Sequence, residues 1–272
     1  MEHQQSLRSD ALASAFGAIA IEAGQIILNA RARGRGVQTK ADGSPVTEAD
    51  LESDKYIRAQ LSAILPSIPI ITEESFGPMG QSDVAGLQNF VLVDPLDGTR
   101  EFVAGRDEFT VNIALIEAKQ PVVGAIYAPA KARLYVAADR AHGADVRPGQ
   151  AMPELSAMQQ LRTSPAPASG LRAVASRSHL DPATRQWLDN QQITQQVSAG
   201  SSLKFCTVAE GAADVYPRCG PTMEWDTAAG HAILLAAGGW VVGFDGTPFR
   251  YGKVEAGFRN AGFVAWGRAP NG

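Results

Sequence analysis

The stretch Val91-Leu92-Val93-Asp94-Pro95-Leu96-Asp97-Gly98-Thr99 decides how the rest of the chain is interpreted. Its apolar start is typical of a buried strand, which we expect to end at Val93, ahead of two acids, a glycine and a hydroxyl. Because Pro95 restricts the turn, the carboxylates of Asp94 and Asp97 and the carbonyl of Leu96 can converge on one point. Oxygen ligands of this kind suit a hard cation such as Mg²⁺.

The same stretch also has a purely structural interpretation. Asp, Pro, Gly and Thr are all common turn formers, so the residues fit a surface turn as well as a metal site. If a metal site is present, the backbone N–H groups of Gly98 and Thr99 face an anion beside it. Further acidic residues elsewhere in the chain that could join this site would favour the metal site over the turn.

Composition indicates a soluble globular protein. The chain has 272 residues, of which 45% are hydrophobic and 19% are charged, so disordered and fibrous classes are excluded. A net charge of −4 argues against a nucleic-acid binder with a broad basic face, although nucleotides remain allowed as substrates. The loop-like composition of residues 141–170 makes them the best boundary between an N-terminal half, 1–150, and a C-terminal half, 151–272.

The sequence suggests a cytoplasmic location. No uninterrupted apolar run approaches the roughly 20 residues that span a bilayer. The N-terminus carries Glu2 and Asp10 and lacks a basic segment followed by an apolar core, so no secretory signal is expected. Cys206 and Cys219 are too few for a disulfide scaffold and are predicted to be packing residues.

The first half is predicted to contain two helices followed by strands. Apolar residues recur at helical intervals over residues 10–33, and a second helix is expected after Thr47, which would cap it in a capping box with Asp50. A short strand before Glu73 ends in acids, which fits a turn or a metal site. Antiparallel strands are predicted at 108–116, 121–127 and 133–137.

The second half alternates strands and helices, which predicts an α/β layer with parallel pairing. Its loops after strands carry Ser176-Arg177-Ser178-His179 and Gly200-Ser201-Ser202-Leu203-Lys204. Ligands of open α/β sheets bind beyond the carboxyl ends of strands, so both loops are candidates for ligand contact. Asp226 begins a later helix, where an acid is most often only a cap.

These acids form a recognisable set with two motifs, Asp94-Pro95-Leu96-Asp97-Gly98-Thr99 and Trp225-Asp226-Thr227-Ala228-Ala229-Gly230. The set resembles the magnesium-dependent, lithium-sensitive phosphatase superfamily that includes inositol monophosphatase and fructose-1,6-bisphosphatase. The resemblance implies the fold of that superfamily, a layered αβαβα sandwich that mixes α+β and α/β features. It runs from the first helix to the last strand.

Within the superfamily the chain is most similar to the 3′(2′),5′-bisphosphate nucleotidases. Four stretches carry this similarity: Thr99-Arg100-Glu101-Phe102, Ser176-Arg177-Ser178-His179, Gly200-Ser201-Ser202-Leu203-Lys204-Phe205 and Tyr216-Pro217-Arg218. The resemblance implies hydrolysis of 3′-phosphoadenosine 5′-phosphate to AMP and phosphate. The alternatives are the same chemistry on inositol monophosphate or another sugar phosphate, and a nucleotide-binding protein without turnover.

The resemblance also implies a role for each site residue. Glu73, Asp94 and the Leu96 carbonyl would hold one Mg²⁺, and Asp94, Asp97 and Asp226 a second. Asp50 and Thr99 would orient a metal-bound water as the nucleophile, with Glu73 also among the catalytic residues and no phosphoenzyme formed. The expected substrate contacts are Gly98, Thr99, His179, Ser201, Lys204, Arg218 and Asp226.

The resemblance also sets expectations about cellular location and partners. Relatives include cytoplasmic proteins and some that are peripheral on the cytoplasmic face of the bacterial inner membrane. The partner expected for this chain is a small nucleotide bisphosphate, without nucleic acid, and the resemblance allows a homodimer.

Overall fold

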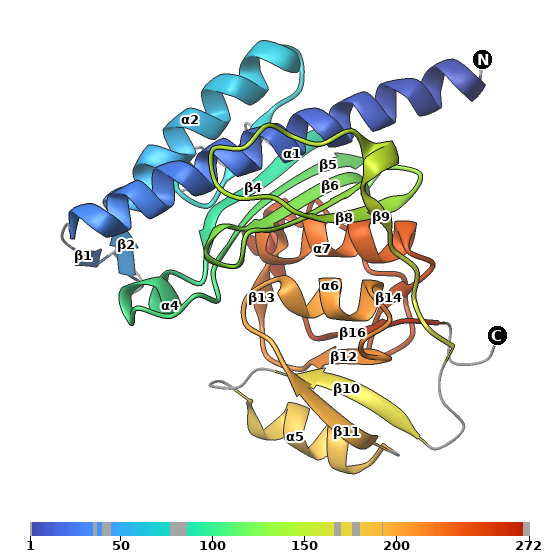
Figure 1. The fold of residues 1–272 in the computed structure, drawn as a ribbon. Helices are drawn as coiled ribbons and strands as arrows, with labels where there is room; N and C mark the ends of the chain where they lie inside the picture. The colour runs from blue at the N-terminus through green and yellow to red at the C-terminus, as the bar shows by residue number, and fades with distance from the viewer. Residues whose placement is uncertain are drawn as a thin grey trace.

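The computed structural model describes residues 2–34, 37–39, 45–76, 86–165, 170–175, 180–191 and 193–268. Helices and sheets alternate in five layers (Figure 1). Helices α1 (Glu2–Arg33) and α2 (Glu48–Ile64) cover one face of a seven-stranded sheet. Helices α6 (Leu203–Ala209) and α7 (Glu224–Ala236) separate it from a five-stranded sheet, whose outer face carries α5 (Pro182–Asp189). The layers follow the predicted αβαβα order.

The first sheet is an extended meander. Its strands pair in the order β3-β4-β5-β6-β7-β8-β9, antiparallel except for β3 with β4. Their bounds are β3 (Ile70–Thr72), β4 (Asn89–Asp97), β5 (Thr110–Glu117), β6 (Gln120–Ala128), β7 (Arg133–Ala137), β8 (Ala141–Asp145) and β9 (Gln159–Gln160). The loop expected at residues 141–170 is therefore partly wrong, since β8 and β9 extend the sheet. The Ala, His, Gly and Asp of β8 are poor strand formers, so pairing with β7 rather than propensity makes the strand.

Strand β4 continues through the motif instead of ending at Val93 as expected. Asp94 pairs with Asn112 of β5, and Asp97 pairs with Thr110, with a register shift between the two pairs. The shift is a bulge, in which β4 contributes one residue more than its partner. Bulges re-aim side chains, and this one lets both acids line the same pocket.

The second sheet has the predicted α/β character. It is ordered β11-β10-β12-β16-β14, and β10 pairs in parallel with both β11 and β12. Its strands are β10 (Leu171–Ala175), β11 (Ile193–Ser198), β12 (Val215–Arg218), β14 (Trp240–Gly243) and β16 (Phe263–Trp266). The division of the chain at residue 150 stays a prediction, although beyond it β9 joins the first sheet and α7 packs against that sheet.

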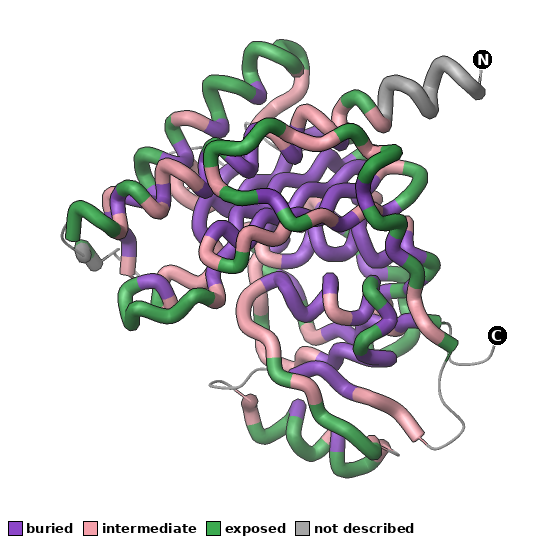
Figure 2. The backbone as a smooth tube through the Cα atoms, viewed as in Figure 1, coloured by how far each residue is buried: buried purple, intermediate pink, exposed green. Residues whose placement is uncertain are grey.

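Short elements complete the fold. They are β1 (Val37–Thr39), β2 (Pro45–Thr47), α4 (Thr99–Val103), η1 (Pro129–Lys131), η2 (Leu155–Ala157), β13 (Thr222–Met223), η3 (Val254–Ala256) and β15 (Arg259–Asn260). The buried residues concentrate in the two sheets and the helices between them (Figure 2). Cys206 is buried in this core, and both cysteines are free thiols.

Small residues of the second motif let α7 approach its neighbours closely. A Cβ added at Gly124 of β6 would lie 2.7 Å from the Ala229 carbonyl oxygen. A Cβ added at Gly230 would lie 2.5 Å from the Phe205 ring of α6. Packing this tight fixes the start of α7, which carries Asp226.

Helix α1 corrects one expectation about membranes. Asp10–Arg33, 24 residues, is long and apolar enough to cross a bilayer by length and composition, contrary to the sequence-based expectation. Half of its most apolar window is buried in the fold, where the helix packs on β5, β6, β7 and α2. The helix contacts a sheet on one side and another helix on a second side. Its apolar composition is therefore that of a core helix.

Candidate active site

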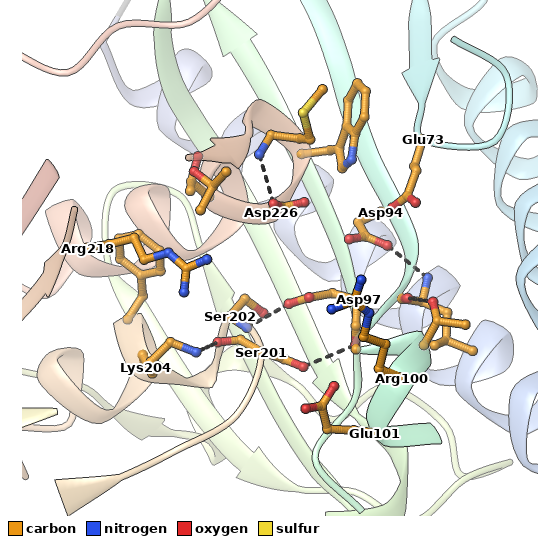
Figure 3. A pocket seen from close by; sticks show the side chains of 18 of the residues that line it. Glu73, Asp94, Asp97, Arg100, Glu101, Ser201, Ser202, Lys204, Arg218 and Asp226 are labelled. Carbon is orange, nitrogen blue, oxygen red and sulfur yellow. Dashed lines mark hydrogen bonds between the residues drawn. The ribbon is translucent and has the colours of Figure 1, made fainter. Parts of the chain in front are cut away.

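A pocket of about 720 Å³ opens beyond the ends of β3 and β4 (Figure 3). It gathers residues from both halves of the chain. The predicted site residues that line it are Glu73, Asp94, Leu96, Asp97, Gly98, Thr99, Ser201, Lys204, Arg218 and Asp226. Asp50 lies behind Thr99, to which it is hydrogen-bonded. His179 falls outside the described residues.

Three carboxylates meet on one side of the pocket. One oxygen each of Glu73, Asp94 and Asp226 lies within 4.8 Å of the other two. Glu73 is placed by its N–H group, which donates to Val93 O of the neighbouring strand at 3.1 Å. Asp226 is placed by the start of α7, where its Oδ2 accepts the Met223 N–H group at 2.8 Å. Asp226 is thus both the expected helix cap and a member of the acidic cluster.

The electrostatics of this cluster favour a bound cation. Burial, followed by repulsion from Glu73, raises the pKa of Asp94 well above its usual value. Burial and repulsion from Asp97 raise the pKa of Asp226 in the same way. Carboxylates held this close repel one another unless a cation lies between them, and an all-oxygen donor set fits Mg²⁺.

Asp97 lies in the same pocket but outside the group of three. Burial raises the pKa of Asp97, and the charge of Lys204 and the N–H group of Ser202 oppose the rise. Its Oδ2 accepts that N–H group at 2.7 Å. The bulge in β4 therefore brings Asp97 into the pocket, and a contact with the second half of the chain holds one of its oxygens.

Asp50 combines the two roles considered for it. Its Oδ2 accepts the N–H group of Thr47 at 2.8 Å and the hydroxyl of Thr47 at 2.6 Å, which completes the predicted capping box of α2. Its Oδ1 lies 3.0 Å from Thr99 Oγ1. The helix cap fixes one oxygen of the carboxylate, so the other faces Thr99 at the edge of the pocket.

Gly98 is required by the local geometry. Its φ of 94° lies in the left-handed region, and a Cβ there would lie 2.5 Å from Ser201 Oγ. The turn at Gly98 starts α4, whose first residue is Thr99. The expected contact of the Gly98 and Thr99 N–H groups with a phosphate stays a prediction.

Two basic side chains come from the other side of the pocket. Lys204 is only 6% exposed, donates to Ser201 O at 2.6 Å and lies 5.5 Å from the Tyr216 ring centroid. Burial lowers the pKa of Lys204 to about 8. The Nε atom of Arg218 is buried and has no hydrogen-bond partner among the described residues. Figure 3 shows both side chains across the pocket from Glu73.

Sequence reasoning missed the polar residues that support the site from β5. Thr110 and Asn112 are at most 1% exposed and lie opposite Asp97 and Asp94. The available signal was the presence of two polar residues in the otherwise apolar run 109–116. Polar side chains are buried only when they are hydrogen-bonded, so these two were candidates for a supporting role. Arg259, which also lines the pocket, gave no such signal.

Comparison with known proteins places this geometry in a family. A sequence model of the inositol monophosphatase family matches residues 8–264. The chain belongs to that family. Both the family and the layered fold predicted from the two motifs are thus confirmed.

The similarity extends to one branch of the inositol monophosphatase family. The 3′(2′),5′-bisphosphate nucleotidase CysQ of Shigella flexneri is 44% identical over 230 residues, which cover 84% of this chain and 87% of that protein. The CysQ of Escherichia coli K12 is 43% identical over the same shares. The crystal structure of CysQ from Bacteroides thetaiotaomicron superposes with a TM-score of 0.79 at 38% identity, covering 96% of this chain and 98% of that one. The predicted branch is confirmed.

Proposed function

We propose that this member of the family removes the 3′-phosphate of 3′-phosphoadenosine 5′-phosphate, giving AMP and inorganic phosphate. The observation that carries the proposal is one pocket lined both by the three clustered carboxylates and by Lys204 and Arg218. The substrate carries a phosphate at each end. A cation bound to the acids suits the phosphate that reacts, and two basic side chains suit the other.

The acidic residues would hold Mg²⁺. We assign one ion to Glu73, Asp94 and the Leu96 carbonyl, and a second to Asp94, Asp97 and Asp226. When bound, the ions neutralise the phosphate charge and lower the pKa of water. The oxygen donors and the raised pKa values of Asp94 and Asp226 support this assignment.

Asp50 and Thr99 are suited to receive the proton of the attacking water. Thr99 carries a single hydroxyl proton with two acceptors, Leu96 O at 3.1 Å and Asp50 Oδ1 at 3.0 Å, and of the two only the carboxylate can take the proton up. As the water attacks phosphorus and the bond to the ribose 3′-oxygen breaks, a proton of the water passes to Thr99 Oγ1 while Thr99 releases its own to Asp50. The departing 3′-oxygen takes up a proton from solvent. The N–H group and the hydroxyl of Thr47 keep the Asp50 carboxylate in position throughout.

Residues of the second half of the chain would bind the nucleotide end of the substrate. Lys204 and Arg218 would bind the 5′-phosphate, and Ser201 would contact the nucleotide beside them. The contact assigned to His179 stays a prediction, as do a homodimer and a cytoplasmic location. The branch of the family and the charge of the pocket support the nucleotide as substrate.

Removing either basic side chain is expected to change substrate preference. Lys204→Ala or Arg218→Ala should lower kcat/KM for 3′-phosphoadenosine 5′-phosphate about 10- to 100-fold, because each would delete a charge-assisted hydrogen bond. Hydrolysis of inositol 1-phosphate, which has no second phosphate, should change far less. Steady-state kinetics on both substrates measure the effect, with exposed Lys55→Ala as control. An equal loss on both substrates contradicts the assignment.

Deprotonation of Lys204 is also expected to lower kcat/KM for the bisphosphate at alkaline pH, and the pH at which this happens is called the alkaline limit. Its lowered pKa means that the ammonium is present below about pH 8 and is lost above it. Because kcat/KM reports ionisations of the free enzyme, it should fall for the bisphosphate above that pH. Lys204→Arg should move the limit upward, since guanidinium stays protonated. A limit unmoved by Lys204→Arg would belong to another group.

The function itself is tested by comparing substrates on the wild-type protein with Mg²⁺. We expect a higher kcat/KM for 3′-phosphoadenosine 5′-phosphate than for inositol 1-phosphate. The opposite order would make the chain an inositol or sugar phosphatase. Absence of turnover on both would leave a nucleotide-binding protein.

A further inference from the structure

A network of buried polar side chains connects Asp97 to the nucleotide-binding loop, residues 200–204, which carries Ser201 and Lys204. The hydroxyl of Ser202 lies 2.7 Å from Asn112 Oδ1 and 2.9 Å from Thr110 Oγ1. The backbone N–H group of Ser202 donates to Asp97 Oδ2, as Figure 3 shows. Thr110, Asn112 and Ser202 are all at most 3% exposed. Polar groups buried this deeply are stable only as hydrogen-bonded partners, so the network specifies one arrangement.

The proton positions in this network follow from its chemistry. Asn112 Oδ1 can only accept, so the Ser202 hydroxyl donates to it. Thr110 then donates to Ser202 at 2.9 Å, which is closer than its other acceptor, Asp97 Oδ2 at 3.4 Å. The amide of Asn112 then turns its Nδ2 toward Asp97 Oδ2, at 3.5 Å. Two N–H donors are therefore directed at one oxygen of Asp97. The other oxygen, Oδ1, accepts no hydrogen bond from the described residues.

The loop is attached to the first sheet at a second point. Ser201 has a φ of 47°, in the left-handed region that non-glycine residues rarely adopt. Its hydroxyl lies 2.8 Å from Glu108 O and 3.1 Å from Asp97 O, and Lys204 holds its carbonyl. These contacts keep the unfavourable backbone conformation in place. They also bring the loop against β4 at Asp97.

We propose that Ser202, Asn112 and Thr110 are positioning residues that orient the Asp97 carboxylate and couple the nucleotide-binding loop to the metal site. The inference rests on the proposed function, in which Asp97 is a metal ligand. Holding Oδ2 leaves Oδ1 in a fixed direction, and partners of this kind set both the geometry and the affinity of metal ligands. A change in the loop then acts on catalysis as well as on nucleotide binding.

The test uses two variants and a matched control. Ser202→Ala removes the centre of the network, and Thr110→Val removes one donor at nearly constant volume. Thr207→Ala is the control, because Thr207 lies on α6, which Ser202 precedes, and among the described residues its hydroxyl donates only to Leu203 O, at 2.9 Å. Calorimetry of Mn²⁺ binding without substrate, kcat and KM for the bisphosphate, and melting temperature are measured for each.

We expect Ser202→Ala to weaken Mn²⁺ binding and to lower kcat by about 10-fold or more, with KM changed less than about threefold. Thr110→Val should act in the same direction, and Thr207→Ala should match the wild type. Wild-type Mn²⁺ affinity in Ser202→Ala, or an effect on KM alone, would overturn the inference. If Ser202→Ala does not fold, Thr110→Val decides by the same criteria. A wild-type protein that fails on the bisphosphate refutes the proposed function, whereas Mn²⁺ binding still tests the network.

Discussion

Asp94→Asn is expected to reduce phosphate release more than about 100-fold and to raise the melting temperature of the metal-free protein. The folded-state pKa of Asp94 is raised above 3.8, so the stability of the metal-free fold falls as the pH rises past that value. Asn removes the buried charge and its repulsion from Glu73 and Asp226. Asn also keeps an oxygen for the Leu96 N–H group, which Asp94 Oδ1 accepts at 3.0 Å.

Calorimetric melting at pH 7 with a chelator, and again with Mg²⁺, measures the stability effect. A gain of 1 kcal/mol corresponds to about 2–4 °C in a protein of comparable size. Mg²⁺ should raise the melting temperature of the wild type and do so much less for Asp94→Asn. Exposed Asp139→Asn serves as the control and should change neither activity nor the response to Mg²⁺. If Asp94→Asn kept both the wild-type activity and the wild-type response to Mg²⁺, Asp94 would hold no metal.

Thr99→Ala is expected to lower kcat by about 10²- to 10⁴-fold, the range of general acid–base catalysis, with a small change in KM. The substitution removes the hydroxyl that lies between Asp50 and the pocket and leaves the Asp50 cap with Thr47 intact. Thr99→Ser keeps the hydroxyl and should retain most of the activity.

Steady-state kinetics on the three proteins, with circular dichroism to verify folding, measure this effect. Asp50→Asn should match Thr99→Ala in kcat, and the double variant should be no worse than either single one, because the two groups act as a unit. Near-wild-type turnover by Thr99→Ala would remove the pair from the mechanism.

Much of the fold could be predicted from the sequence because its helices and most of its strands have clear periodicity. The run at residues 10–33 and the β-branched strands of the meander are examples, and the structure has both. Strand β8 could not be predicted, since it depends on pairing with β7. The extension of β4 to Asp97 was missed for a related reason, because a bulge is set by the register with β5.

The turn at Pro95 predicted that Asp94, Leu96 and Asp97 converge, but the addition of Asp226 to the cluster was predicted only through the resemblance. Asp226 lies more than half the chain away from Glu73, and each of the three acids Glu73, Asp94 and Asp226 taken alone fits a turn or a helix cap. Their convergence within 4.8 Å is a tertiary property. The support of Asp97 by Ser202 depends on a contact between the two halves, and the burial that lowers the pKa of Lys204 is likewise a tertiary property.

Product analysis of 3′-phosphoadenosine 5′-phosphate incubated with the wild-type protein and Mg²⁺ tests directly whether the enzyme removes the 3′-phosphate. Chromatography of the nucleotides together with a phosphate assay gives both products from one reaction. We predict AMP and inorganic phosphate in equal amounts, with no release in the presence of a chelator. Formation of adenosine 3′-phosphate, or phosphate release no greater than that of Asp94→Asn, would refute the proposed reaction.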